Sequence, residues 1–215
     1  MNKAAVIVIA IDGPAAAGKG TLARRLAAHL GYAYLDTGAI YRAVALKLLK
    51  QNIAADSIPA ILAAAEALEP ADLAAEELRT DPVGDMASQI AAIPALRDAL
   101  VNFQRLFAAR PPGDAPGAVL DGRDIGTVIC PTADKKLFVT ASAEERARRR
   151  YRELADRGEQ VSEKEVLDDL KKRDARDQNR TVAALRPAED AYLLDTTNLG
   201  IDEAFAAALD YIAAR

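Results

Sequence analysis

The amino-acid sequence predicts an α/β fold in which helices cover both faces of a five-stranded parallel sheet. Short, near-continuous apolar runs are typical of strands buried in such a sheet, and five of them occur along the chain. Segments with helical periodicity lie between these runs. A glycine-rich loop joins the first run to the first helical segment. Alternation of this kind is typical of a doubly wound fold, with ligands bound outside the carboxyl ends of the strands.

The five predicted strands are residues 6–11, 32–35, 118–120, 136–139 and 192–194. The predicted helices are residues 21–30, 39–51, 57–68, 86–109, 142–157, 162–178 and 201–213. Pro94 lies inside the fourth helical segment and is expected to break or restart it, because proline lacks the backbone N–H that a helix interior needs.

Two regions fall outside the alternation. Residues 53–92 are rich in alanine and acidic residues and are predicted to form a helical insert. Residues 144–186 are dense in charge, and we expect them to form a mobile lid that carries arginines onto phosphates. A solvated pair of charged helices is the alternative. The chain is then one domain, residues 1–215, with a core of residues 1–52, 93–143 and 187–215.

Composition excludes several classes of protein. Of the 215 residues 51% are hydrophobic, enough for a large core, and the net charge of −4 argues against a general nucleic-acid binder. The longest apolar stretch, residues 4–11, is too short to cross a membrane, and no secretion signal is evident. Cys130 is the only cysteine, which excludes an intrachain disulfide and a cysteine-based zinc site. We expect a cytoplasmic monomer that binds neither nucleic acid nor membrane.

The loop between the first strand and the first helix has the spacing G-x-x-x-x-G-K of a phosphate-binding P-loop. Glycine lets the backbone approach a phosphate closely, successive N–H groups point at the anion, and the lysine supplies a full positive charge. The residues expected to bind ATP here are Gly13, Pro14, Ala15, Ala16, Ala17, Gly18, Lys19, Gly20 and Thr21. The usual hydroxyl after the lysine is displaced by one position. We therefore expect Mg²⁺ to be held by phosphate oxygens and waters, with Thr21 the one side chain that could contribute.

Three further strings follow predicted strands or lie on the helix after the lid: Leu35–Arg42, Asp121–Thr127 and Lys172–Arg180. Together with the P-loop, which ends in Gly-Lys-Gly-Thr, they closely resemble the bacterial cytidylate kinases through nearly the whole chain. The resemblance implies a P-loop kinase fold and transfer of the γ-phosphoryl group of ATP to CMP or dCMP.

Arginines are suited to the acceptor phosphate, because a guanidinium can bond two oxygens at once. Arg42, Arg123 and Arg180 lie on different predicted elements and could meet only at a crevice at the strand ends. Arg173, Asp177 and Arg180 are spaced i, i+4, i+7 and share one helix face. Asp177 could accept hydrogen bonds from ribose hydroxyls with Arg173 beside it, and the resemblance implies the same assignment.

Cytosine presents an amino donor at N4 and acceptors at N3 and O2. Asp124 could accept from N4 while Ser88 and Arg97 donate, and the last two match the base-contacting pair of the family. A structural ion pair beside a turn is the alternative for Asp124, and an inert helix residue is the alternative for Ser88. Thr37 stands where the family often has serine and could donate to the acceptor phosphate, and we place Asp121 in the same acceptor site.

The expected mechanism is direct in-line attack of the acceptor phosphate on the γ-phosphorus, for which no strong general base is needed. Lys19 would hold the donor, and Arg123, Arg173 and Arg180 would stabilise the transferring group. Two lid arginines, Arg149 and Arg152, are expected to join them on the ATP side.

Two other functions remain open at this point. One is a P-loop kinase for another small acceptor, such as UMP, AMP or shikimate. The other is a nucleotide-driven switch that hydrolyses ATP or GTP slowly. The span from Glu66 to Gly84 is shorter than the insert that family members often carry, so selection of cytosine over uracil is open as well.

Overall fold

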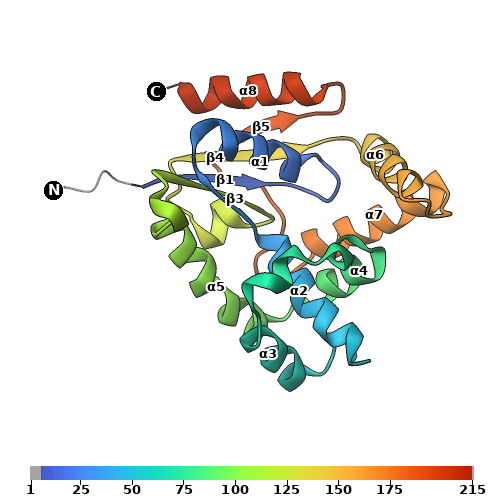
Figure 1. Cartoon of the computed structure of the whole chain (residues 1–215). Coiled ribbons are helices and arrows are strands. Elements are labelled where there is room, and N and C mark those ends of the chain that lie inside the picture. Colours follow the sequence, from blue (N-terminus) through green and yellow to red (C-terminus); the bar gives the residue numbers. More distant parts are fainter. Residues whose placement is uncertain (1–5, 215) are drawn as a thin grey trace.

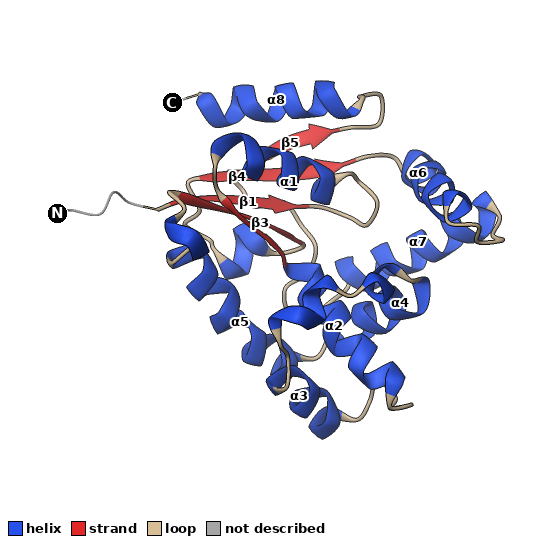
Figure 2. Ribbon diagram, viewed as in Figure 1, coloured by secondary structure: helices blue, strands red, loops and turns tan. Residues whose placement is uncertain are grey.

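Five parallel strands form the centre of the molecule in a computed structural model that describes residues 6–214 (Figures 1 and 2). The strands are β1 (Ile7–Asp12), β2 (Ala33–Asp36), β3 (Gly117–Gly122), β4 (Lys135–Thr140) and β5 (Tyr192–Asp195). Their order in the sheet is β2-β3-β1-β4-β5, and every adjacent pair is parallel. All five predicted strands are present, and the predicted doubly wound α/β fold is confirmed.

Alternating side chains of the central strands enter two separate cores, as strand geometry requires. Ile9 and Ile11 of β1 pack with helices α1 (Lys19–Leu30) and α8 (Ile201–Ala213) on one face of the sheet. Ala10, between them in the sequence, enters the second core with helices on the other face, so helices cover both faces (Figure 1).

The second core is formed with α2 (Thr37–Lys50), α3 (Ile58–Glu66), α4 (Asp81–Ile90) and α5 (Pro94–Ala109), of which α2 and α5 pack on the sheet. The single helix predicted over residues 86–109 is thus two helices, and α5 begins at Pro94, as its sequence position indicates. α4 begins five residues earlier than predicted, because Pro82 occupies its first turn, where a missing N–H does no harm. Between α3 and α4 lie two short 3₁₀ helices, η1 (Pro70–Ala74) and η2 (Glu76–Arg79).

The charged segment forms a helical hairpin of α6 (Ala143–Asp156) and α7 (Glu163–Gln178). Ser142 caps α6, and Ser162 forms a reciprocal capping box with Glu165 at the start of α7. Gly158 turns the chain between the two helices at φ 80°. The hairpin has its own small apolar core, which also includes Ala15 of the P-loop, so it packs directly against the predicted phosphate-binding loop.

The sequence does not predict two short elements. η3 (Pro112–Asp114) is a 3₁₀ turn before β3, and η4 (Ile125–Ile129) is a one-turn π-helix directly after it. Within residues 6–214, no helix combines the length and the apolar character needed to span a bilayer.

Candidate active site

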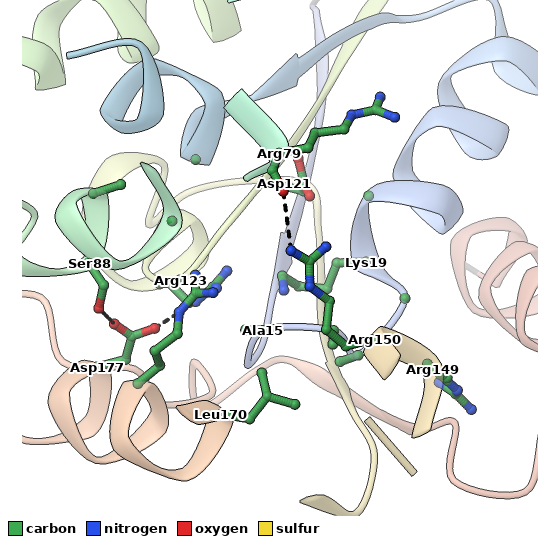
Figure 3. A pocket seen from close by; sticks show the side chains of 18 of the residues that line it. Ala15, Lys19, Arg79, Ser88, Asp121, Arg123, Arg149, Arg150, Leu170 and Asp177 are labelled. Atoms are coloured by element: carbon green, nitrogen blue, oxygen red, sulfur yellow. Dashed lines mark hydrogen bonds and ion pairs between the residues drawn. The ribbon is translucent and has the colours of Figure 1, made fainter. Parts of the chain in front are cut away.

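A cleft of about 1290 Å³ opens at the carboxyl ends of the strands (Figure 3). Its walls come from the P-loop, the start of α2, α4, the loop after β3, both helices of the charged hairpin and the loop after β5. All the predicted site residues line this cleft except Gly13 and Pro14, which lie at the base of the P-loop. The chain segments predicted from the sequence to bind the phosphoryl donor and the phosphoryl acceptor therefore line the same cleft.

Lys19, the P-loop lysine, is buried, with 6% of its surface exposed. Its Nζ donates to the carbonyl oxygen of Pro14 at 2.7 Å, which folds the side chain back under the loop. Burial, reinforced by the charge of Arg123, lowers the pKa of Lys19 below its ordinary value. An anionic phosphate in the cleft would relieve both effects, because it supplies the negative charge that the ammonium lacks.

Two contacts fix the shape of the P-loop. Gly13 has φ +145°, and a Cβ at this position would lie 1.9 Å from the carbonyl oxygen of Val139, so no other residue fits there. Arg146 donates to the carbonyl oxygen of Ala15 at 3.2 Å and forms a buried ion pair with Asp174 at 2.7 Å. Arg146 thus supports the loop from behind and does not line the cleft with the other lid arginines.

Asp177 is the centre of the acceptor side (Figure 3). Its Oδ2 accepts from Arg123 Nε at 2.9 Å, its Oδ1 forms an ion pair with Arg180, and Ser88 Oγ lies 3.5 Å from Oδ1. Burial opposes ionisation of this carboxyl, but the charges of Arg123 and Arg180 outweigh it and hold its pKa below the ordinary value. Asp177 is therefore an anion that holds the neighbouring Arg180 together with Arg123 and Ser88 from distant parts of the chain.

The arginines of this cluster retain donors for a ligand. The Nε atoms of Arg42, Arg173 and Arg180 are buried and have no hydrogen-bond partner. Arg173 lies against α4, where its Nη1 is 3.3 Å from the position that a Cβ would take at Gly84. Buried donors without acceptors are costly, so this concentration of positive charge fits a ligand with several anionic oxygens.

The predicted base-binding residues are also close together. Arg97 and Asp124 form a buried ion pair, and Arg97 Nη1 donates to the carbonyl oxygen of Ala91 at 3.3 Å. The guanidinium of Arg97 lies 5.8 Å from the ring centroid of Tyr41. Burial raises the pKa of Asp124 against the effect of Arg97. The structural ion pair expected as the alternative for Asp124 is thus present, and because Arg97 bonds only Oδ2 the pairing of Asp124 with a ligand stays a prediction.

Thr37 and Asp121 lie where the P-loop meets the acceptor side. Thr37 Oγ1 donates to the backbone carbonyl of Asp121 at 2.8 Å, and Tyr34 donates its hydroxyl to Asp121 Oδ1 at 3.0 Å. Asp121 Oδ2 lies 3.6 Å from the Cβ position of Gly20 in the P-loop. Burial, with the nearby charge of Asp36, raises the pKa of Asp121. Asp121 thus faces the donor loop as well as the acceptor pocket.

An ion pair with Asp36 at 2.7 Å restrains the side chain of Arg42. Asp36 also caps α2 by accepting from the backbone N–H of Ala39 at 2.9 Å. The cap of the helix and the position of the arginine are therefore set by one carboxylate.

The lid arginines divide into different environments. Arg149 donates to Thr196 Oγ1 at 3.0 Å, next to the P-loop, and Arg152 is exposed on the wall of the cleft. Arg150 donates to the backbone carbonyl of Arg79 at 3.1 Å and pairs with Asp81, so it joins α6 to the start of α4.

Sequence reasoning missed several residues at the site. Tyr41 and Arg150 line the cleft, and Asp12 lies buried just behind it. A polar residue at the end of an apolar strand, such as Asp12, is a signal that could have been used. Arg150 gives no such signal, because the partners that place it at the cleft, Arg79 and Asp81, lie about seventy residues away in the sequence.

Comparison with known proteins agrees with this geometry. The family model for cytidylate kinase matches residues 9–214. The chain belongs to the cytidylate kinase family. A cytidylate kinase of Paramagnetospirillum magneticum is 58% identical over 97% of this chain and 98% of its own length. A cytidylate kinase of Rhodospirillum rubrum is 55% identical over 96% of this chain and 97% of its own length. The resemblance and the enzyme class predicted from the sequence are confirmed.

A solved structure supports the fold alone. The crystal structure of TT1252 from Thermus thermophilus covers 97% of this chain and 96% of its own, with a TM-score of 0.52 and 23% sequence identity. For the cytidylate kinase family the reaction is phosphoryl transfer from ATP to CMP or dCMP.

Proposed function

We propose that this cleft transfers the γ-phosphoryl group of ATP to CMP or dCMP by direct in-line attack, giving ADP and the nucleoside diphosphate. The observation that carries the proposal is that Arg123, Arg173 and Arg180 gather around Asp177 in the same cleft as Lys19. Two anionic phosphates that must react with each other need such a shared cationic space, because in phosphoryl transfer the protein mainly aligns the reactants and neutralises charge.

We assign the donor side to the P-loop, Lys19 and two lid arginines. The backbone N–H groups of Gly13–Thr21 and the N-terminus of α1 would bind the β- and γ-phosphates. Arg149 supports this assignment, since its Nη1 lies 3.9 Å from the Cβ position of Gly18. Arg152 lies on the same wall and would approach the phosphates as the lid closes.

We assign the acceptor phosphate to Arg42, Arg123 and Arg180, with Thr37 and Asp121 completing this side. Asp177 would accept from the ribose hydroxyls, with Arg173 beside it. The charges of Arg123 and Arg180 lower the pKa of Asp177, so its carboxylate is ionised and can accept hydrogen bonds from the ribose without a change of protonation.

The base would be selected by Ser88, Arg97 and Asp124. Arg97 uses Oδ2 of Asp124 and leaves Oδ1 for the amino group at cytosine N4, a donor that uracil lacks. Arg97 and Ser88 would donate to the ring acceptors.

Mg²⁺ fits the donor set beside the P-loop. Thr21 and Asp121 both line the cleft near Gly20, and Mg²⁺ prefers oxygen ligands and retains several waters. No group of three or more His, Cys, Asp or Glu side chains is placed to hold a metal ion within residues 6–214. We therefore propose that phosphate oxygens and waters supply most of the ligands. When bound, the ion would neutralise negative charge on the β- and γ-phosphates.

We further propose that the enzyme acts as a cytoplasmic monomer without nucleic-acid or membrane partners. The net charge of −4 supports the absence of a nucleic-acid partner, because a general nucleic-acid binder is basic overall.

The test is ADP release from Mg·ATP with CMP, dCMP, UMP, AMP and no acceptor in parallel. Rapid turnover with CMP and dCMP, weak turnover with UMP and none without acceptor supports the whole assignment. Equal rates with UMP would overturn the role of the base pocket, and activity only without acceptor would overturn the kinase in favour of a hydrolytic switch.

A further inference from the structure

Asp12 is a buried carboxylate that the proposed mechanism does not use. It is the last residue of β1, directly before the P-loop, and only 4% of its surface is exposed. It does not line the cleft. In the sheet it pairs with Gly122 of β3 and with Phe138 of β4, so its position is fixed on both sides.

Both carboxylate oxygens of Asp12 are used within the protein. Oδ1 accepts from the backbone N–H of Ile125 at 2.8 Å, and Oδ2 accepts from the backbone N–H of Gly126 at 2.7 Å. These two N–H groups belong to the first turn of η4, the π-helix that follows β3. A single side chain at the end of β1 therefore holds the backbone of the neighbouring loop by two bonds.

The loop held in this way carries two residues of the proposed acceptor site. Arg123 and Asp124 directly precede the clamped residues, and Asp124 is the N-terminal cap residue of η4. From there Arg123 reaches Asp177, and Asp124 reaches Arg97. A shift of this backbone would move both side chains together.

The space around the contact leaves little room for adjustment. A Cβ at Gly126 would lie 3.4 Å from Asp12 Oδ2 and 3.2 Å from Cδ of Lys136. Without the carboxylate, two buried N–H groups would lack acceptors, which is a costly arrangement. The loop would then have to move to find other partners.

We propose that Asp12 is a positioning residue for base selection: it holds Asp124 and Arg123 at the place where the acceptor nucleotide meets the P-loop. The inference rests on the proposed function, since it concerns how that site discriminates cytosine from uracil. Asp12 touches neither substrate, and its effect is transmitted through the backbone of residues 123–126.

The experiment compares Asp12→Asn with the unmodified enzyme, using CMP and UMP as acceptors at saturating ATP, and ATP as the varied substrate at saturating CMP. The amide presents one acceptor and one donor, so one of the two backbone N–H groups loses its partner. We expect KM for CMP to rise about tenfold and the ratio of kcat/KM for CMP over UMP to fall about tenfold. KM for ATP should change less than threefold.

Asp134→Asn is the matched control. Asp134 Oδ2 accepts from the backbone N–H of Val8 at 2.8 Å, at the opposite end of the same strand. The control makes the same acid-to-amide change at a contact with the backbone of β1 without touching residues 123–126, so its CMP to UMP ratio should equal that of the unmodified enzyme. An equal loss of selectivity in both variants would overturn the inference.

A second variant covers the case in which Asp12→Asn does not fold. Gly126→Ala approaches the same contact from the other side, and its methyl group must displace either the carboxylate or the Lys136 stem. The same selective rise of KM for CMP is expected.

The inference is overturned if a folded variant keeps both KM for CMP and the CMP to UMP ratio, or if KM for ATP rises while the CMP parameters stay constant. Failure of the proposed function is a different result, because the unmodified enzyme would then lack CMP-dependent turnover.

Discussion

Lys19 is predicted to be essential for the reaction and dispensable for the fold. Its charge is disfavoured by burial and by Arg123, and its one close internal partner among the contacts described above is the Pro14 carbonyl. The side chain is thus held ready for an anion, and the protein gains little from the charge when no phosphate is bound.

Replacing Lys19 by methionine keeps most of the stem and removes the charge. We expect kcat/KM to fall about 10³-fold, the effect of removing one preorganised donor from developing charge, while the melting temperature stays within a few degrees. Lys136→Met is the control: Lys136 Nζ also donates to a carbonyl five residues earlier, at Pro131, but it pairs with Asp190 and lies outside the cleft. That variant should lose stability and keep turnover. Near-normal kcat in Lys19→Met would contradict the P-loop assignment.

The carboxyl of Asp12 predicts a pH dependence of stability. Burial raises its pKa from 3.8 to about 7, against the two backbone N–H groups that favour the charged form. Asp124 and Lys19 face it from the neighbouring loop and from α1, and the stem of Lys136 lies close by on β4. Between pH 5 and 7 the folded protein therefore binds a proton that the unfolded chain has lost, so its free energy of unfolding decreases as the pH rises through this range.

The measurement is urea unfolding of the unmodified protein and of Asp12→Asn at pH 5, 6, 7 and 8. The difference in unfolding free energy, unmodified minus variant, should fall from pH 5 to 7 and level off above 7. A difference that stays constant from pH 5 to 8 would contradict this, because it would mean that the two N–H groups keep Asp12 ionised throughout.

At the scale of elements, α7 organises the acceptor side through one face. Arg173 and Asp177 share that face, whereas Arg180 lies just beyond the end of the helix and pairs with Asp177 from there. Asp177 is the point at which α7, α4 and the loop after β3 are joined. The carboxylate that α7 supplies at Asp177 thus offsets the repulsion between the arginines around it.

Asp177→Ala should therefore weaken use of the acceptor in two ways, by removing the proposed ribose acceptor and by releasing Arg123 and Arg180. We expect KM for CMP to rise at least tenfold and kcat to fall, with KM for ATP changed much less. Steady-state kinetics with each substrate varied in turn measures this. Asp168→Ala, an exposed position on the same helix that lies outside the cleft, is the control. A rise in KM for ATP alone would contradict the ribose assignment.

At the scale of the whole molecule, the lid and the insert are joined across the cleft. Arg150 of α6 bonds the Arg79 carbonyl and the Asp81 side chain, and Arg157 also donates to the Arg79 carbonyl, at 3.2 Å. Because α6 borders the donor side and α4 borders the acceptor side, this bridge should make binding of each nucleotide favour binding of the other.

A double-mutant cycle of Arg150→Ala and Asp81→Ala tests the bridge. In calorimetry, an unreactive ATP analogue should strengthen CMP binding in the unmodified enzyme, and each single variant should lose about threefold to tenfold of that gain. The double variant should lose no more than either single variant, because the pair acts as a unit. Arg148→Ala, which removes an exposed pair within α6, should leave the gain unchanged. Additive losses would contradict the bridge.

Much of this molecule could be predicted from its sequence, because its signals are local. The run from β1 through Lys19 into α1 is a contiguous motif, and helical spacing alone puts Arg173 and Asp177 on one face. The prediction that Arg180 shares this helix face is wrong, because α7 ends at Gln178 and Arg180 reaches Asp177 from the segment that follows. The contact of Arg123 with Asp177 spans 54 residues and depends on how α7 docks, which no local pattern encodes. η4 was missed because a single π-turn has no periodicity to detect. The start of α4 was misplaced because Pro82 is also typical of a loop. The functional roles of the site residues stay predictions until the variants above are measured.

The strand order has a consequence for how the enzyme can change. β1 and β3 are neighbours, and Asp12 and Gly122, the residues from which the P-loop and the acceptor loop depart, are paired in register. Adjacent strands lie about 4.8 Å apart, a spacing fixed by their backbone hydrogen bonds. The spacing of β1 and β3 therefore fixes the distance between the points at which the two loops leave the sheet. We therefore expect substitutions in the predicted lid or insert to alter how long the nucleotides stay bound, and to leave the separation of the two loop bases unchanged.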